Sequence, residues 1–414
     1  MRTLPEALQS IEVPNRLAAS LLGSWSGCVA KLALASQRSS PALAPLPGGP
    51  AAVRGTLAHR VIEQWIKGEG PDDPEALFAA AYERLRDELK ADASCAAFAE
   101  LAEVFGAAEW SAFRAGVLRR CEPSARRTTD RQQGQAFDHI EGRRLTGVEV
   151  PLTSEALRLK GRADRISKLA ADRYEIRDFK SGAVLDDSGE IKQSICLQLQ
   201  AYGLMFLEAR PDAELALVVD IGKEIPVAFD LATRTRARER IKDLLTPIPA
   251  AGRYPVGTLT RPGADCLGCR VRHRCSDYLA KAPSWWLRYP DASVRIPYDS
   301  WGTINAMSEG VTGVDVTLED AAGRRVRIDR VDHRHGLTFS HLGCAIWLFD
   351  LESPGPARDF RGQRYHPRVF HELPRDRRER RAWGAQVFLG TNGVFLGTNG
   401  ARAENSAEDA TPHA

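Results

Sequence analysis

Two stretches of the sequence decide the fold: Gly161-Arg-Ala-Asp164 and Tyr174-Glu-Ile-Arg-Asp178-Phe-Lys180. Both have the pattern of β-strands, and residues two apart on a strand, such as Asp178 and Lys180, point to the same face. We expect Asp164 to lie across from them on a neighbouring strand. Two carboxylates that share a small volume repel each other unless a divalent cation lies among their oxygens. The pattern therefore predicts a metal site, and its alternative is a pair of surface strands with ordinary salt bridges.

The segments around these stretches predict a mixed α/β core. Strands are expected at 145–152, 157–169, 173–179, 215–221 and 225–230, and helices at 191–208 and 236–245. Strands and helices in this order form a mixed sheet flanked by helices. Further helices are expected over about 1–35, 54–66 and 74–119, because their apolar residues recur with helical spacing.

Four motifs in chain order resemble the PD-(D/E)XK nuclease superfamily, and specifically its RecB-like branch. They are Gly55-x-x-x-His59, Gly161-Arg-x-Asp164, Asp178-Phe-Lys180 and Gln198-x-x-x-Tyr202. The resemblance covers about residues 20–280. Each motif is weak alone, but the four at these spacings are specific.

The resemblance implies a role for each matching residue. The metal ligands would be His59, Asp164, Asp178 and the main-chain carbonyl of Phe179. Lys180 would be catalytic, and Gln198 and Tyr202 would contact the DNA backbone or brace the site. Mg²⁺ and Mn²⁺ both suit carboxylate and carbonyl oxygens, and either lowers the pKa of a bound water.

His59 has an alternative interpretation, because a lone histidine on a helix is more often a core or surface residue than a ligand. As a ligand it would favour Mn²⁺ over Mg²⁺. Glu63, one helical turn after His59, and Glu149, on the strand before Asp164, could assist as ligands. The alternative is that both are ordinary charges.

A cysteine pattern indicates a second metal centre. Cys266, Cys269 and Cys275 have the spacing C-x₂-C-x₅-C, and Cys28 is the candidate for a fourth ligand. This arrangement resembles iron–sulfur nucleases of the same branch, the AddB-type and CRISPR adaptation nucleases, which implies a [4Fe–4S] cluster. Tetrahedral Zn²⁺ is the alternative. Either metal would tie the N-terminal segment to the end of the nuclease core. The other cysteines, Cys95, Cys121, Cys196 and Cys344, are interpreted as buried or incidental thiols.

Composition excludes several classes of protein. The 414 residues are 43% hydrophobic and 27% charged, with a formal net charge of +3. These values are typical of a globular chain and exclude a wholly disordered or fibrous one. No apolar run approaches the ~18–20 residues of a membrane helix, and residues 1–11 lack a signal-peptide apolar core. We therefore expect a soluble, cytoplasmic protein without a membrane partner.

The length predicts two or three domains. The expected division is residues 1–50 as a helical segment with one cluster cysteine, 51–282 as the nuclease domain with a helical insert at about 72–143, 283–372 as an OB-fold-like β domain, and 373–414 as a basic and then disordered tail.

A small barrel of five short strands is expected after the nuclease domain, at about 292–296, 313–318, 324–331, 337–342 and 345–349. Such a barrel could hold single-stranded DNA by stacking bases on aromatic rings. The candidates are Trp285, Trp286, Tyr298, Trp301, Trp347 and Phe349, with the basic stretches 324–330 and 358–368 nearby. The alternative is that these aromatic residues form the core of the barrel.

Together these patterns predict a metal-dependent DNA nuclease, an exonuclease on single-stranded ends in repair, recombination or related processing. A DNA-binding module or partner subunit with an inactive nuclease centre is the alternative, and RNA is an alternative substrate. The sequence contains no helicase P-loop, so coupled unwinding would need a helicase or another DNA-processing protein as a partner.

Overall fold

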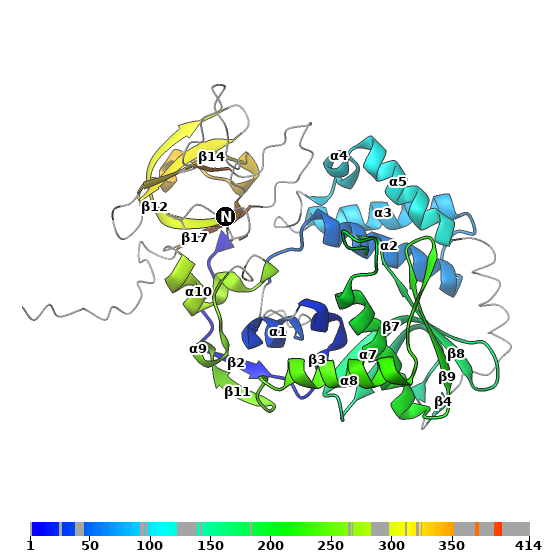
Figure 1. Ribbon diagram of the computed structural model, residues 1–414. Helices are drawn as coiled ribbons and strands as arrows, with labels where there is room; N and C mark the ends of the chain where they lie inside the picture. Colours follow the sequence, from blue (N-terminus) through cyan, green and yellow to red (C-terminus); the bar gives the residue numbers. More distant parts are fainter. Residues whose placement is uncertain are drawn as a thin grey trace, which may run out of the picture.

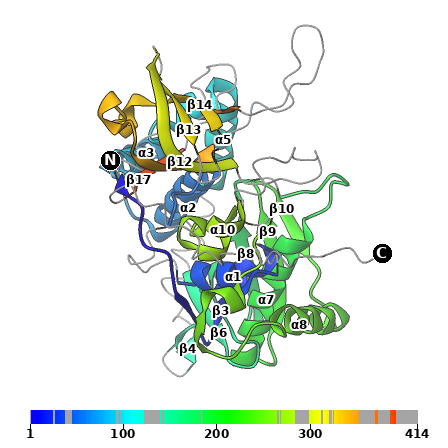
Figure 2. The same ribbon diagram turned by 90° about the vertical axis from the view of Figure 1, so that its left-hand side faces the viewer.

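The computed structural model of the chain is shown in Figures 1 and 2. The residues that the structure describes are 2–24, 27–37, 45–91, 95, 98–121, 139–140, 143–182, 184–263, 266, 268–282, 298–310, 313–319, 323, 325–351, 369–371 and 385–390. Among the expected features, the strand at 292–296, Trp285, Trp286 and the basic stretch 358–368 lie outside these residues.

A mixed sheet carries the two acidic stretches, and its described strands include those expected from the sequence. They are β6 (Gly147–Ser154), β7 (Leu159–Lys168), β8 (Arg173–Phe179), β9 (Glu214–Asp220) and β10 (Glu224–Val227). The order is β10-β9-β8-β7-β3, where β3 is Leu17–Ala18, and β6 also pairs with β7. β8 and β9 are parallel, whereas β6, β7 and β8 pair antiparallel. The prediction of a mixed α/β core is confirmed.

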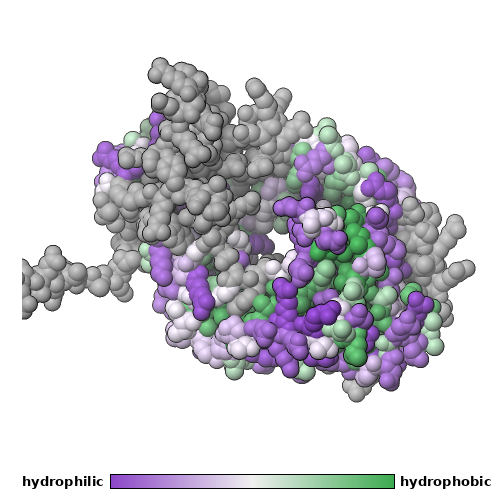
Figure 3. All heavy atoms as spheres, in the orientation of Figure 1, coloured by the Kyte–Doolittle hydropathy of each residue, from purple (hydrophilic) through white to green (hydrophobic). Residues whose placement is uncertain are grey.

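Two helices accompany this sheet, α7 (Gln193–Ala209) and α8 (Leu231–Leu245). α7 contributes buried residues such as Leu199 and Phe206 to the same apolar core as Ile166 and Ile176 of the sheet. Its mostly apolar sequence explains this burial, because a helix that is hydrophobic on most sides is covered on most sides. On the face shown in Figure 3, hydrophobic residues gather in a strip over α2 and α7.

A group of helices forms a second core beside the sheet. They are α2 (Pro50–Lys67), α3 (Pro74–Ala91), α4 (Leu101–Phe105) and α5 (Ala107–Arg120). Apolar residues at helical spacing, including Leu57 and Val61, pack against Leu77 and Phe78 of α3. Phe179, the last residue of β8, joins this core. The end of β8 is therefore held between the sheet and the helices.

The N-terminal segment differs from the helix expected over residues 1–35. Its described residues form the strands β1 (Arg2–Thr3), β2 (Ser10–Val13) and β3, a 3₁₀ helix at Ala19–Ser24 and the α-helix α1 (Val29–Ala35). β2 pairs with β11 (Gly252–Pro255). The reason is visible in the burial pattern, since Ile11 and Val13 are buried and Glu12 between them is exposed. This period of two is that of a strand.

The C-terminal strands form an open sheet over the described residues. They are β12 (Tyr298–Glu309), β13 (Val314–Glu319), β14 (Arg325–Val331), β15 (Ala345–Leu351), β16 (Val369–His371) and β17 (Gln386–Leu389). The order is β1-β17-β15-β12-β13-β14-β16, with β1 and β16 at the two edges. The described strands therefore do not close into the expected OB-fold-like barrel.

In this region one expectation, the strand at 337–342, is wrong, and the interpretation of the aromatic residues as core holds for three of them. The strand expected at 337–342 is a loop with a short 3₁₀ turn at Phe339–His341, because Thr338 and His341 cap that turn with each other's main-chain and side-chain groups. Trp301, Trp347 and Phe349 are buried in one apolar cluster with Phe388. These three rings are core residues and do not offer free faces to nucleic acid bases.

A buried ion-pair cluster joins the C-terminal sheet to the preceding loop. The Arg272 guanidinium donates to both carboxylate oxygens of Asp299, at 2.6 and 3.0 Å, and also to Asp350. Tyr278 of α10 (Ser276–Lys281) donates to Asp299 as well. His273 stacks on Phe388 at a ring-centroid distance of 5.7 Å. These contacts attach the C-terminal sheet to the rest of the protein.

The remaining described elements are short: β4 (His139–Ile140), β5 (Arg143–Arg144) and α9 (Val256–Leu259). Within the described part of the chain, no helix is both long enough and apolar enough to cross a membrane.

Candidate metal centre

Three strands place a row of carboxylates on one face of the sheet. Arg165 pairs with Arg177, so the next step of the same register sets Asp164 opposite Asp178. On the other strand, Val148 pairs with Arg165 and Val150 with Ala163, which sets Glu149 opposite Asp164. Directly opposed residues of antiparallel strands share a face. The register thus directs Asp164 and Asp178 to one face of the sheet, where the charge of Asp178 acts on Asp164, whereas the group of ligand atoms within 4.8 Å of one another consists of His59, Glu149 and Asp164.

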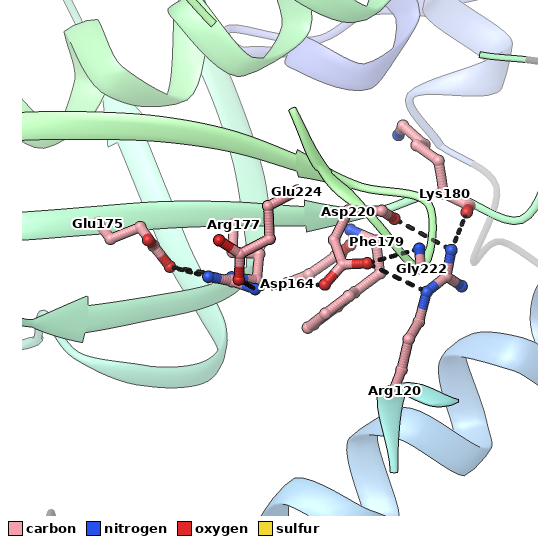
Figure 4. A network of polar contacts seen from close by, with 9 residues as sticks. All are labelled: Arg120, Asp164, Glu175, Arg177, Phe179, Lys180, Asp220, Gly222 and Glu224. Carbon is pink, nitrogen blue, oxygen red and sulfur yellow. Dashed lines mark hydrogen bonds and ion pairs between the residues drawn. The ribbon is translucent and has the colours of Figure 1, made fainter. Parts of the chain in front are cut away.

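β7 and β8 separate at this row. Their pairing ends at Arg165 and Arg177, and beyond it the Phe179 main-chain N–H donates to the Asp164 carboxylate at 2.7 Å instead of to a main-chain carbonyl. Figure 4 shows Asp164 beside Phe179. Burial, followed by the charge of Asp178, raises the pKa of Asp164 well above its usual value. A nearby cation would lower that pKa again, because it favours the charged carboxylate.

His59 of α2 lies against this row. Its Nδ1 is 3.7 Å from Asp164 Oδ2, and ligand atoms of His59, Glu149 and Asp164 all lie within 4.8 Å of one another. Burial lowers the pKa of His59, which favours the neutral imidazole that binds metals. Burial also raises the pKa of Glu149, whose backbone φ of 53° is unusual for a residue other than glycine. Glu63 instead pairs with Lys67.

Lys180, Gln198 and Tyr202 form a chain of contacts beside Asp178. Lys180 Nζ lies 2.9 Å from Asp178 Oδ2 and donates to Gln198 Oε1 at 3.3 Å. Gln198 Nε2 donates to the Tyr202 hydroxyl at 3.1 Å. Tyr202 is buried, and its ring lies so close to Gly161 that a Cβ there would meet it at 2.5 Å. Gly161 therefore leaves the space that the Tyr202 ring fills.

The donor set fits a divalent cation. Asp178 is 2% exposed, and its Oδ2 has no partner in hydrogen-bond geometry within the described residues, although the Lys180 ammonium faces it. Buried polar atoms normally have hydrogen-bond partners, so such an atom needs an explanation. Carboxylate oxygens and a neutral imidazole on one small volume suit Mn²⁺ or Mg²⁺.

A family comparison agrees with this geometry. The model of the PD-(D/E)XK nuclease superfamily matches residues 16–276, which is more than half of the chain. The chain belongs to the PD-(D/E)XK nuclease superfamily. Its members are metal-dependent nucleases that use Mg²⁺ or Mn²⁺, and the group His59, Glu149 and Asp164 offers ligand atoms for such an ion. The comparison with curated proteins finds no match.

The four cysteines singled out in this PD-(D/E)XK nuclease line one pocket. Cys28 directly precedes α1, and Cys266, Cys269 and Cys275 lie on the loop before α10. Burial, with a smaller effect of the neighbouring thiols, raises the pKa of Cys266 to about 11 and that of Cys275 to about 12. Among the described residues, no three of these sulfurs lie within 4.8 Å of one another.

Sequence reasoning missed Arg120 and Asp220, which hold the main chain next to the site (Figure 4). Arg120, the last residue of α5, donates to the Lys180 carbonyl at 2.7 Å and to Asp220 Oδ1 at 3.2 Å. Arg177 lies 3.3 Å from Asp220 Oδ2. Neither residue belongs to a motif, and the only available signal for Asp220 was its position at the end of a buried strand.

Proposed function

We propose that this PD-(D/E)XK nuclease hydrolyses phosphodiester bonds of DNA at the site formed by His59, Asp164, Asp178 and Lys180. The observation that carries the proposal is the buried Asp178 carboxylate, whose charge acts on Asp164 and whose Oδ2 lies 2.9 Å from Lys180 Nζ but accepts no hydrogen bond in regular geometry from the described residues. Two adjacent carboxylates in a partly buried site cost stability, and such a cost is typical of functional sites.

The ligands that we propose are His59 Nδ1, carboxylate oxygens of Asp164 and Asp178, and the main-chain carbonyl of Phe179. Glu149 is a further candidate, because it stands opposite Asp164 and shares the 4.8 Å group with His59. A divalent cation bound there would supply Lewis-acid stabilisation of phosphate charge and lower the pKa of a water molecule.

The protein's own groups would orient the reaction. We propose that the Lys180 ammonium, held by Asp178 and Gln198, stabilises the negative charge that develops on the phosphate and orients the attacking water. Gln198 and Tyr202 would act as braces, because the buried Tyr202 hydroxyl fixes the Gln198 amide, which in turn fixes Lys180. Of the two roles implied for this pair, bracing agrees better with the burial of Tyr202.

We further propose that the enzyme is an exonuclease on single-stranded DNA ends in DNA repair, recombination or related processing, in cooperation with a helicase or another DNA-processing protein. The support for this finer proposal is the resemblance of the four motifs to the RecB-like branch. RNA remains the competing substrate, and the substrate comparison below distinguishes the two.

A [4Fe–4S] cluster held by Cys28, Cys266, Cys269 and Cys275 is also proposed, with Zn²⁺ as the alternative. Four thiols around one pocket support a shared metal group. The resemblance of the cysteine pattern to iron–sulfur nucleases of the RecB-like branch favours the [4Fe–4S] cluster over zinc. Iron and sulfide analysis of anaerobically purified protein tests it, and stoichiometric zinc without iron would exclude the cluster.

The test of the nuclease proposal is cleavage of end-labelled DNA with Mg²⁺ or Mn²⁺, using linear single-stranded, linear double-stranded and circular single-stranded substrates beside RNA. We expect cleavage of linear DNA by the wild type and none by Lys180→Ala. Lys168→Ala is the matched control, because Lys168 stands at the other end of β7, near the Tyr174 ring. Binding of DNA without cleavage would support an inactive module, and cleavage of the circle would reject an exonuclease.

A further inference from the structure

Arg120 of α5 holds the main chain of Lys180. The Lys180 N–H donates to the Asp220 carbonyl at 2.9 Å, and the Lys180 carbonyl accepts from Arg120 Nη2 at 2.7 Å. The same Arg120 nitrogen also donates to the Asp220 carbonyl, at 3.1 Å. The Lys180 N–H is therefore attached to the end of β9 directly, and the Lys180 carbonyl is attached to it through Arg120.

These contacts lie where the regular sheet no longer holds β8. The pairing of β8 with β9 ends at Phe179 and Asp220, and the pairing of β8 with β7 ends earlier, at Arg177. Lys180 is the first residue beyond the strand. Without Arg120, its carbonyl would lose the only partner that the structure gives it among the described residues.

The direction of the Phe179 carbonyl depends on the same attachment. Along an extended strand, successive main-chain carbonyls point to opposite sides. The Phe179 N–H points to Asp164, and the Lys180 N–H points to Asp220. Fixing Lys180 toward β9 therefore keeps the polar main-chain groups of Phe179 directed toward Asp164.

Arg120 itself is held firmly in place. Its side chain is 6% exposed, and its Nε pairs with Asp220 Oδ1, which also accepts from the Gly222 N–H at 2.8 Å. The next residue, Cys121, is buried in the helical core that contains Phe179. Arg177 holds the other oxygen of Asp220. The Arg120 guanidinium thus has a fixed position and connects α5 to the end of β9.

We propose that Arg120 is a positioning residue, which connects the helical insert to the catalytic centre and sets the orientation of Lys180 and of the Phe179 carbonyl. This inference rests on the proposed nuclease function. Arg120 is too buried to contact a substrate, so it acts through the main chain of Lys180. A misplacement of about 1 Å in a catalytic group can cost about a hundredfold in rate.

The test compares Arg120→Ala and Arg120→Lys with Arg114→Ala. Arg114 lies on the same helix and pairs with Glu75 of α3, away from β8. We expect Arg120→Ala to lower kcat by about a hundredfold while DNA affinity changes less than about twofold. Arg120→Lys should recover only part of the rate, and guanidinium at non-denaturing concentration should partly restore Arg120→Ala. A folded Arg120→Ala protein with at least half the wild-type kcat would overturn the proposal.

A second measurement does not require activity. Hydrogen exchange of peptides that cover residues 178–182 should be faster in Arg120→Ala than in Arg114→Ala, whereas unchanged exchange would overturn the positioning role. If Arg120→Ala does not fold, Arg120→Met/Asp220→Asn removes both charges together and is compared in the same way. An inactive wild type with faster exchange in the Arg120 variant would reject the proposed function and retain the positioning role.

Discussion

Two clusters of buried charge in this protein behave in opposite ways. Around Arg272, whose side chain is 3% exposed, the guanidinium meets Asp299, Asp350 and the Cys269 carbonyl, and the Asp350 N–H donates to Asp299 at 2.9 Å. Around Asp164 and Asp178, the charge of one carboxylate acts on the other where β7 and β8 separate, and Asp178 Oδ2 has no partner in hydrogen-bond geometry among the described residues.

The difference shows how buried charges of structural and of catalytic use can be told apart. In the Arg272 cluster both oxygens of the buried Asp299 carboxylate accept hydrogen bonds within the protein, and removing Arg272 would leave this carboxylate buried without its cation. In the Asp164 cluster Asp178 Oδ2 accepts no hydrogen bond in regular geometry from the described residues, although Lys180 Nζ lies 2.9 Å away. We infer that the first cluster joins two parts of the fold and that the second is completed by an ion.

The largest expected effect is on catalysis. Lys180→Ala should lower metal-dependent cleavage by about a thousandfold or more, since the ammonium would no longer stabilise the charge that develops on the phosphate. Thermal unfolding at saturating Mn²⁺ should change little, because a cation bound to the buried Asp178 carboxylate would offset the loss of the Lys180 charge. Single-turnover cleavage and calorimetry on the same samples check both statements. A large loss of stability in this variant would show that Lys180 has a structural role like that of Arg272.

The next effect is on folding. Arg272→Ala should lower the free energy of unfolding by about 3–5 kcal/mol, because Asp299 would be left buried without its cation. Urea denaturation measures this change. Equal stability of the variant and the wild type would show that the cluster does not hold the C-terminal sheet in place.

A smaller effect of opposite sign is expected at the metal centre. Asp164→Asn should raise the free energy of unfolding of the metal-free protein by about 1 kcal/mol, because it removes the repulsion with Asp178 while the amide oxygen still accepts from Phe179. Denaturation in the presence of a chelator measures it, and a decrease in stability would contradict the assignment.

The pH dependence of stability sharpens the same comparison. The folded state raises the pKa of Asp164 above 3.8, so folding retains a proton that the unfolded chain releases. The resulting stabilisation is complete below pH 3.8 and is lost as the pH rises through the folded-state pKa. Metal-free wild type should therefore lose stability over this range relative to Asp164→Asn. If the free energy of unfolding changed with pH in the same way for the two proteins, the pKa of Asp164 would not be raised in the folded state.

The smallest effect belongs to an exposed pair. Arg325→Ala should change the free energy of unfolding by less than about 0.5 kcal/mol, because its pairing with Glu319 lies in solvent. Denaturation in urea checks it. If Arg325→Ala lowered the free energy of unfolding as much as Arg272→Ala, solvent exposure would not explain the difference between an exposed and a buried ion pair.

The sequence predicted the strands around Asp164 and Asp178 because their alternation is set by local pattern, and the register then brought the two carboxylates together. It did not predict the contact of Arg120 with Lys180, since no spacing rule joins residues 60 positions apart. It also placed a strand at 337–342, where local hydrogen bonds of Thr338 and His341 outweigh an apolar pattern. The local sequence pattern therefore predicts strands and helices, but it does not predict contacts between distant segments such as that of Arg120 with Lys180.

The most direct test of the central claim is a Mn²⁺ titration of single-turnover DNA cleavage, with wild type, Asp178→Asn and Lys180→Ala compared at equal folded fraction. The account predicts saturable Mn²⁺-dependent cleavage by the wild type, loss of Mn²⁺ binding in Asp178→Asn, and retained Mn²⁺ binding without cleavage in Lys180→Ala. Cleavage at the wild-type rate by either folded variant would contradict the account.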